Sequence, residues 1–274
     1  MINQTKPIYP TVLQLLGIFL IYLAFMIPVI LVSLLIFKIF KYENPSLLNL
    51  IGYAVTGVLT LWYAWRKKVR LEKDHRVFCF GKVHWLLYLV LVPSTLLIGI
   101  FTDPVNILIP VPDFMLEIFR SLSQKDIYTF LMVSICGPIF EELLFRGVVL
   151  NGFLKLYNPW KAIILSSLFF GLFHLNPWQF VPAFLIGMLI GYVYWKSGSL
   201  LPCLFIHWLN NTAYWLLNAL INKEILSLAD LFTSRLWYYL SVAGSLILLL
   251  ASLYLLQSFI LKHPLRETLA DNKA

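Results

Sequence analysis

Long apolar runs recur along this chain, and each is close to the length that an α-helix needs to cross a lipid bilayer. A spanning helix requires about 20 predominantly apolar residues, because each residue advances the helix by only about 1.5 Å. A window of that length finds eight candidate spans, at residues 11–37, 47–65, 85–101, 128–150, 162–174, 180–195, 200–220 and 236–261. In lipid, a backbone satisfies its hydrogen bonds only within helices or closed barrels, so the sequence predicts an all-α, polytopic integral membrane bundle of about eight transmembrane helices.

The composition agrees with a membrane location. Hydrophobic residues make up 60% of the chain and charged residues only 12%, whereas an average soluble domain has about 25% charged residues. The net charge of +8 is compatible with nucleic acid, but basic residues in a membrane protein collect in cytoplasmic loops beside anionic lipid headgroups. We therefore expect the lipid bilayer as a partner, and no nucleic acid.

The chain is predicted to be one integral membrane domain covering residues 1–274. It shows no internal repeat, and its largest polar segment, 66–83, is too short to fold by itself. The first apolar run is too long for the hydrophobic part of a signal peptide and lacks a small-residue cleavage site, so a retained first helix is expected. The cysteines are too scattered to indicate disulfides or a metal site; they are Cys79, Cys136 and Cys203.

The distribution of basic residues predicts the orientation. Threading eight spans with the amino terminus inside places most of the 21 Lys and Arg residues on one face, including the cluster in the loop 66–82. That face is expected to be cytoplasmic, because cytoplasmic loops carry the excess of Lys and Arg. We therefore expect a multi-pass protein of the cell membrane with both termini in the cytoplasm.

Two adjacent carboxylates, Glu141 and Glu142, lie inside the fourth apolar run, and no other carboxylate falls inside a predicted span. An acidic residue at the centre of a bilayer costs about 2.5 to 3.5 kcal/mol on insertion scales, so it indicates a partner and usually a function. Two further spans also carry polar groups. The fifth ends at His174, and the seventh contains His207, Asn210 and Asn211.

These polar groups are expected at similar depths in the membrane. At about 1.5 Å per residue from the lysine at the cytoplasmic end of each helix, Glu141 is roughly 21 Å deep, His174 roughly 20 Å and His207 roughly 16 Å. The lysines that serve as markers are Lys155, Lys161 and Lys196. An acid and two imidazoles from three helices are therefore predicted near the middle of the bilayer.

Spacing within the fourth span separates the two glutamates. Glu142 and Arg146 are four residues apart and share one helix face, so they are expected to pair. Glu141 is rotated from Glu142 by about 100° and is therefore the freer carboxylate.

The same four-residue spacing recurs in the other two spans. It places the ring of Phe170 beside the imidazole of His174. It also aligns His207 with Asn211, so that both can donate hydrogen bonds toward one point, as an oxyanion hole requires. Asn210 is almost as well placed as Asn211.

Three strings carry a specific resemblance: EELLFR at 141–146, FGLFH at 170–174 and HWLNN at 207–211. They resemble the EExxxR, FxxxH and HxxxN motifs of the CAAX protease and bacteriocin-processing family of intramembrane glutamic endopeptidases. All three occur in the family's order on separate predicted spans. The resemblance covers about 128–220, which is the expected catalytic core, and members of this family commonly have eight spans.

The resemblance implies that an activated water hydrolyses a peptide bond, without a cofactor. Glu141 would be the general base, and His174 would hold and polarise the water. His207 and Asn211 would stabilise the oxyanion. The supporting residues would be Glu142, Arg146, Phe170 and Asn210. The substrate would be a membrane-associated peptide, such as a prenylated CAAX-like peptide, a bacteriocin or a signalling peptide.

Each of these residues also has a structural interpretation. Glu142 and Arg146 can form a purely architectural ion pair, and a histidine in a membrane span often bonds only to a neighbouring helix. For Asn210 a structural role is favoured, and for Phe170 a packing role. Glutamates and histidines are adequate zinc ligands, so zinc remains a minor alternative, although the chain has no HExxH motif.

Two other functions stay open beside the protease. A proton-coupled transporter would use Glu141, His174 and His207 as a relay, although the chain lacks the matched halves with broken spans that many transporters show. A bacteriocin immunity protein would keep the motifs but bind its peptide without cutting it. The endopeptidase is the favoured interpretation.

Overall fold

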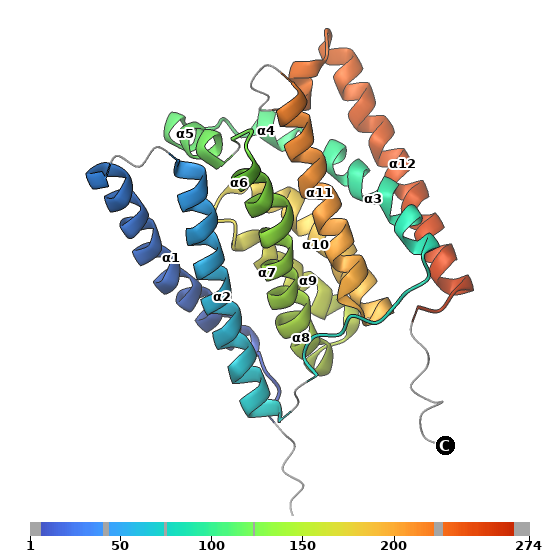
Figure 1. Ribbon diagram of the computed structural model, residues 1–274. Coiled ribbons are helices and arrows are strands. Elements are labelled where there is room, and N and C mark those ends of the chain that lie inside the picture. The colour runs from blue at the N-terminus through green and yellow to red at the C-terminus, as the bar shows by residue number, and fades with distance from the viewer. Residues whose placement is uncertain (1–6, 41–43, 74–75, 123, 222–226, 266–274) are drawn as a thin grey trace, which may run out of the picture. The chain divides into compact units, whose positions relative to one another are not determined.

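The computed structural model describes residues 7–40, 44–73, 76–122, 124–221 and 227–265, and all regular structure in these ranges is helical (Figure 1). The long single helices are α1 (Val12–Phe40), α2 (Pro45–Glu72), α3 (Leu86–Thr102), α10 (Pro177–Ser197), α11 (Leu200–Leu220) and α12 (Arg235–Lys262). The shorter ones are α4 (Val105–Leu108), α5 (Asp113–Leu122), α9 (Pro159–Leu172) and the 3₁₀ turn η3 (Leu228–Leu231). The predicted all-α fold is confirmed. The two chain ends, for which a cytoplasmic location is predicted, lie outside the described residues.

Each of the eight predicted spans corresponds to a helix. Within the described ranges, six helical stretches are long and apolar enough to cross a membrane: Val12–Ile39, Pro45–Glu72, Leu86–Leu108, Ile127–Leu156, Pro177–Ser197 and Arg235–Lys262. The other two predicted spans are α9, which has 14 residues, and α11, which carries the polar residues of the third motif. The polytopic membrane fold is therefore confirmed.

The helices divide between two compact units. The first comprises residues 1–78, 111–162 and 211–222, and the second comprises 79–110, 163–210 and 223–274. The chain passes repeatedly from one unit to the other, and two of these passages lie inside α9 and α11. This division does not test whether the chain behaves as one domain, so the single integral domain stays a prediction.

In the first unit, α2 is the helix to which the others attach. α1 packs along it, and so do α5 and the helical stretch Ile127–Leu156. The buried residues of α2 recur every fourth position, which defines one face of a helix; they include Thr56, Thr60, Ala64, Lys68 and Glu72. Gly57 allows α2 to lie close to the stretch Ile127–Leu156, since a Cβ at Gly57 would lie 2.7 Å from the ring of Phe140.

A buried ionic cluster holds the segment before α1 against α2. The Nζ of Lys68 donates to the carbonyl oxygen of Tyr9 at 2.6 Å and lies 2.9 Å from Oε1 of Glu72. The backbone N–H of Tyr9 also donates to Glu72, at 2.9 Å, and Lys155 binds the second oxygen of Glu72 at 2.5 Å. Glu72 thus joins three segments, which are the one before α1, α2 itself and the one that carries Lys155. Glu72 lies at the end of α2 where most of the positive charge of this helix is found.

We expect Glu72→Gln to lower the free energy of unfolding by about 1–3 kcal/mol, because a neutral amide leaves the buried cation of Lys68 without its counter-charge. Lys68 and Glu72 are only 2% and 6% exposed. The measurement is chemical unfolding of the purified protein in detergent micelles. The matched control is Glu117→Gln on the exposed surface of α5, which should stay within about 0.5 kcal/mol of wild type. Equal loss in both variants would contradict a structural role for the cluster.

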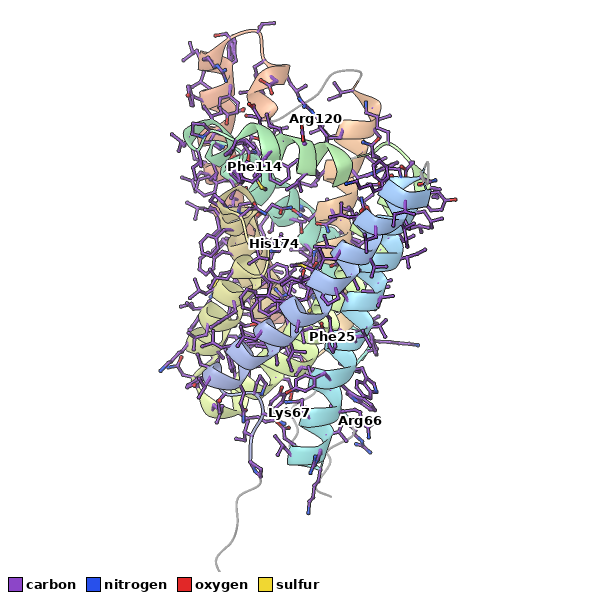
Figure 2. All side chains as sticks on the ribbon, turned by 90° about the vertical axis from the view of Figure 1, so that its left-hand side faces the viewer. Phe25, Arg66, Lys67, Phe114, Arg120 and His174 are labelled. Carbon is purple, nitrogen blue, oxygen red and sulfur yellow. The ribbon has the colours of Figure 1, made fainter. Side chains whose placement is uncertain are left out.

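Basic side chains lie at both ends of the first unit. Figure 2 shows Arg66 and Lys67 near one end, on α2, and Arg120 at the opposite end, on α5. Arg66 and Lys67 are helical, so the predicted loop 66–82 begins later than expected, after α2 ends at Glu72. The separation of these residues agrees with two membrane faces, and which face is cytoplasmic stays a prediction.

In the second unit, α3 packs against α12 and α10. The hydroxyls of Ser94 and Ser252 share a hydrogen bond of 2.9 Å between α3 and α12. The stretch Leu86–Leu108 also contains a buried carboxylate, Asp103, which accepts bonds from the hydroxyls of Ser227 and Tyr238 at 2.6 and 2.8 Å. This corrects the expectation that the two glutamates are the only carboxylates within a span, because the helical stretch runs past the predicted limit at residue 101.

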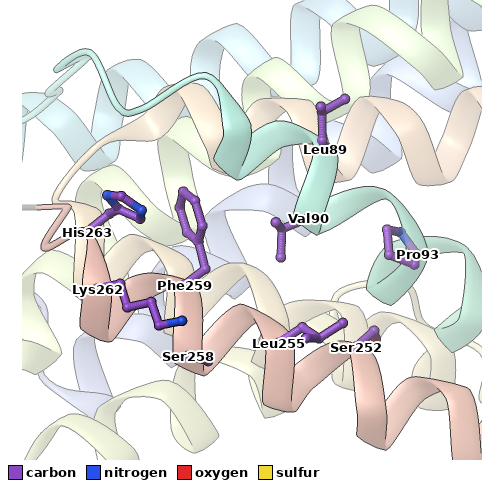
Figure 3. Close-up of a pocket in the computed structure, with 9 residues that line it drawn as sticks. All are labelled: Leu89, Val90, Pro93, Ser252, Leu255, Ser258, Phe259, Lys262 and His263. Atoms are coloured by element: carbon purple, nitrogen blue, oxygen red, sulfur yellow. The ribbon is translucent and has the colours of Figure 1, made fainter.

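A groove of about 460 Å³ lies between α3 and α12 (Figure 3). Its lining is mostly apolar and ends in two basic side chains, the full set being Leu89, Val90, Pro93, Ser252, Leu255, Ser258, Phe259, Lys262 and His263. None of these residues belongs to the three motifs. The groove is therefore separate from the residues that the sequence marks for chemistry.

Candidate active site

The two adjacent glutamates lie in the middle of the continuous helical stretch Ile127–Leu156. It consists, in order, of α6 (Ile127–Phe130), η1 (Leu131–Cys136), α7 (Gly137–Glu142), η2 (Leu143–Leu150) and α8 (Asn151–Leu156). Both η segments are π-helical, so a wide turn stands on either side of the short helix that ends with Glu141 and Glu142. Such turns are rare and frequently lie at functional sites. The sequence pattern did not predict them.

Pro138 leaves one backbone carbonyl of η1 without a donor from its own helix. The N–H of Gly137 bonds to the carbonyl of Met132, five residues back. In the same pattern the carbonyl of Val133 would accept from residue 138, but proline has no N–H. The side-chain amide of Asn211 fills this place and donates to Val133 at 2.9 Å. Asn211 therefore fixes the carboxyl-terminal half of α11 to η1.

Glu142 and Arg146 form the ion pair that their spacing predicted. Arg146 presents Nη1 to Oε1 of Glu142 at 3.2 Å and Nε to Oε2 at 3.1 Å. The side chains are 0% and 1% exposed. The first contact is a hydrogen bond and the second an ionic contact, and in a buried pair of this kind the loss of either partner is costly.

Glu141 points elsewhere, as the rotation between neighbouring residues requires. Its Oε1 accepts a hydrogen bond of 2.6 Å from the phenol of Tyr53, on α2. The expectation that Glu141 is the freer carboxylate is thus corrected, because it has a hydrogen-bond partner from another helix. Tyr53 lies outside the motif region, and nothing in the sequence separates it from the other tyrosines in predicted spans.

His174 lies in the second unit, in the turn after α9. The prediction that it ends a helix at 162–174 is corrected, since α9 ends at Leu172. Its Nδ1 lies 2.9 Å from the carbonyl oxygen of Phe170. A carbonyl oxygen only accepts, so Nδ1 is the donor in this contact, and in that tautomer Nε2 is the acceptor.

The turn that holds His174 is fixed by its neighbours. Leu175 adopts a left-handed conformation with φ of 58°, which is unusual for a side chain of this size. Asn176 then caps α10 by accepting from the N–H of Gln179 at 2.9 Å, and its own amide donates to the carbonyl of His174 at 2.8 Å. The imidazole is therefore carried by a well-bonded turn.

One phenyl ring contacts both histidines of the motifs. The ring of Phe170 meets His174 edge-on at a centroid distance of 5.3 Å and His207 at 5.6 Å. Phe170 and His207 are buried, and a Cβ at Gly187 of α10 would come within 3.2 Å of Phe170. The predicted packing of Phe170 on His174 is confirmed, and the structure adds His207 to the same cluster.

The motif residues thus form two sets, each within one unit. The first set is Glu141, Glu142, Arg146 and Asn211, and the second is Phe170, His174 and His207, with the half-buried Asn210 beside it on α11. In the first set the structure pairs Glu142 with Arg146, and in the second it packs Phe170 against both histidines. That both sets surround one water molecule stays a prediction from the sequence.

No group of three or more His, Cys, Asp or Glu side chains suitable for a metal ion is present among the residues with described positions. Metal-independent chemistry accordingly remains a prediction, to be tested with a chelator.

The fold defines the class, which is a polytopic helical membrane protein. Residues 123–213 match the family model described as type II CAAX prenyl endopeptidase Rce1-like. The matched residues contain all three motifs, so the predicted resemblance to the CAAX protease and bacteriocin-processing family is confirmed.

A relative from Escherichia coli is described only as an uncharacterized 24.3 kDa protein. It is 31% identical over 126 residues, which make up 44% of this chain and 58% of that protein. The chain therefore spans little more than half the length of this relative. No solved structure gives a significant match to the chain.

Proposed function

We propose that this protein is an intramembrane endopeptidase that hydrolyses a peptide bond of a membrane-associated substrate through a water activated by Glu141. The observation that carries the proposal is the family match over 123–213, which contains the three motifs in order. The local geometry supports it, because Glu141 follows a π-helical turn and accepts a hydrogen bond from the phenol of Tyr53.

In the proposed reaction Glu141 takes a proton from water while the water oxygen bonds to the carbonyl carbon of the scissile peptide. The tautomer of His174 supports a role in holding that water, since Nε2 accepts one of its hydrogens. The proton on Glu141 then passes to the leaving nitrogen as the C–N bond breaks. Water supplies both the oxygen of the new acid and the proton of the new amine, so the hydrolysis is balanced.

His207 and Asn211 are proposed to stabilise the oxyanion. The amide nitrogen of Asn211 is held in place by its bond to the carbonyl of Val133. The ion pair of Glu142 and Arg146 is proposed to orient the carboxyl end of α7. Donors that are fixed before the reaction stabilise a developing charge most effectively, because no reorganisation is then required.

The substrate class is proposed from the family. A prenylated peptide ending in a CAAX-like sequence presents its lipid to the bilayer and its scissile bond close to the membrane. The apolar exterior of the spanning helices suits a substrate that arrives through the bilayer. The relay and immunity alternatives lack a specific supporting observation in either unit.

We expect purified protein in detergent to cleave a farnesylated CAAX peptide and to keep its full rate in excess EDTA. The physical reason is that Glu141 chemistry requires no Lewis acid. The measurement is mass spectrometry of the products over time, with the same peptide lacking the farnesyl group as a comparison. A rate abolished by EDTA and restored by zinc would contradict the glutamate mechanism, and absence of cleavage of either peptide would contradict the proposed substrate class.

A further inference from the structure

The hydroxyl of Tyr53 donates a hydrogen bond to Glu141, and Tyr53 belongs to none of the three motifs. We infer that Tyr53 is a positioning residue, which holds the carboxylate of Glu141 in the orientation required to take a proton from water. This inference deepens the proposed function and rests on it. It adds a residue of α2, outside the matched residues 123–213, to the working parts of the site.

The hydrogen bond has the geometry of a strong interaction. The two oxygens are 2.6 Å apart, within the range of O–H bonds to an ionised carboxylate, which are about twice as strong as bonds between neutral groups. A phenol is also the appropriate kind of partner for a base. A guanidinium, as Glu142 has in Arg146, would compete directly with an incoming proton, whereas a phenol orients the carboxylate without adding a positive charge of its own.

One glycine, Gly57, allows α2 to approach the glutamates this closely. A Cβ at Gly57 would lie 2.7 Å from the ring of Phe140, the residue before Glu141. Gly137 lies beside the bond as well, since a Cβ there would be in ordinary contact with the hydroxyl of Tyr53 at 3.5 Å and with Oε1 of Glu141 at 3.8 Å. The ring of Tyr53 also packs on Phe140 at 6.5 Å between centroids. Side chains on both helices are therefore closely fitted around the bond.

Fixing Glu141 matters because its side chain has three rotatable bonds and follows an irregular turn. A displacement of about 1 Å at a reacting group can cost 10²-fold in rate. The bond from Tyr53 to Oε1 fixes the orientation of the whole carboxylate. Tyr53 touches neither the water nor the substrate in this scheme and acts through Glu141.

The test is Tyr53→Phe, assayed on the farnesylated CAAX peptide with the amount of folded protein measured separately. We expect kcat to fall about 10- to 100-fold with KM unchanged. The matched control is Tyr63→Phe on the same helix, whose hydroxyl meets Lys67 at 3.2 Å and which should keep wild-type kcat. A merely structural role for Tyr53 would lower the unfolding midpoint and leave the kcat of the folded protein unchanged.

A second background shows whether Tyr53 acts through Glu141. Aspartate is shorter by one methylene and cannot keep the same bond, so Tyr53→Phe should cause less than a threefold further loss in the Glu141→Asp protein. An equal loss in both backgrounds would overturn the inference. If Tyr53→Phe does not fold, Gly57→Ala replaces it, since a Cβ there would lie 2.7 Å from the ring of Phe140 and must move α2 away from the residue before Glu141, which should lower kcat in the same way.

The outcomes separate this inference from the function on which it rests. Inactive Glu141→Gln together with fully active Tyr53→Phe would overturn the role of Tyr53 alone. Active Glu141→Gln would overturn the base assignment and the inference with it.

Discussion

Replacing Glu141 by glutamine is expected to remove peptide cleavage while the protein stays folded. The amide has the same shape and its oxygen still accepts from Tyr53, but it cannot take a proton from water. General-base catalysis contributes about 10²- to 10⁴-fold to a rate, and we expect a loss at the upper end, because hydrocarbon around the site offers no substitute base. The measurement is single-turnover cleavage of the farnesylated peptide beside thermal unfolding in detergent.

Glu117→Gln serves as the control, since it makes the same chemical change on the exposed surface of α5. It should cleave at the wild-type rate. A Glu141→Gln protein that turns over its peptide as fast as wild type would remove the carboxylate from the mechanism, and the buried acid would then need another explanation.

Replacing Arg146 by leucine is expected to destabilise the protein by about 3–5 kcal/mol, because it leaves the carboxylate of Glu142 buried without its counter-ion. Glu142 is 0% exposed, so water cannot replace the guanidinium. The measurement is chemical unfolding in detergent, together with the yield of folded protein.

The double variant Glu142→Leu with Arg146→Leu separates architecture from chemistry. Exchanging a buried pair for apolar residues of similar size is often neutral or stabilising, so most of the lost stability should return. Cleavage should stay impaired if the pair orients the end of α7. A double variant with both stability and activity restored would assign the pair to architecture alone, and a stable single variant would show that the pair is dispensable.

The helical fold followed from the sequence because length and apolarity are sufficient to predict a spanning helix. The interior pairing of Glu142 with Arg146 followed too, since a four-residue spacing places both on one helix face. These are local properties, fixed by helical geometry before any tertiary contact is formed. They explain why each predicted span corresponds to a helix in the described residues, with the limits of α9 differing by two or three residues from the prediction.

The contacts between distant segments could not be predicted in the same way. Tyr53 reaches Glu141 from 88 positions earlier in the chain, and no periodicity reports which tyrosine of α2 faces which acid. The π-helical turns were also missed, although Pro138 was visible as a residue without an N–H. Its consequence depends on Asn211, which supplies the missing donor from another helix.

The attachment of Tyr9 has a practical consequence for protein engineering. Lys68 and Glu72 hold this residue through its main-chain carbonyl and N–H, groups that almost every amino acid offers. Only proline lacks the N–H, so these two main-chain hydrogen bonds should persist after most side-chain substitutions at this position. Removing the residues before α1 would remove these two hydrogen bonds and leave Lys68 and Glu72 without their backbone partners. A shortened expression version should therefore keep residues 7–11.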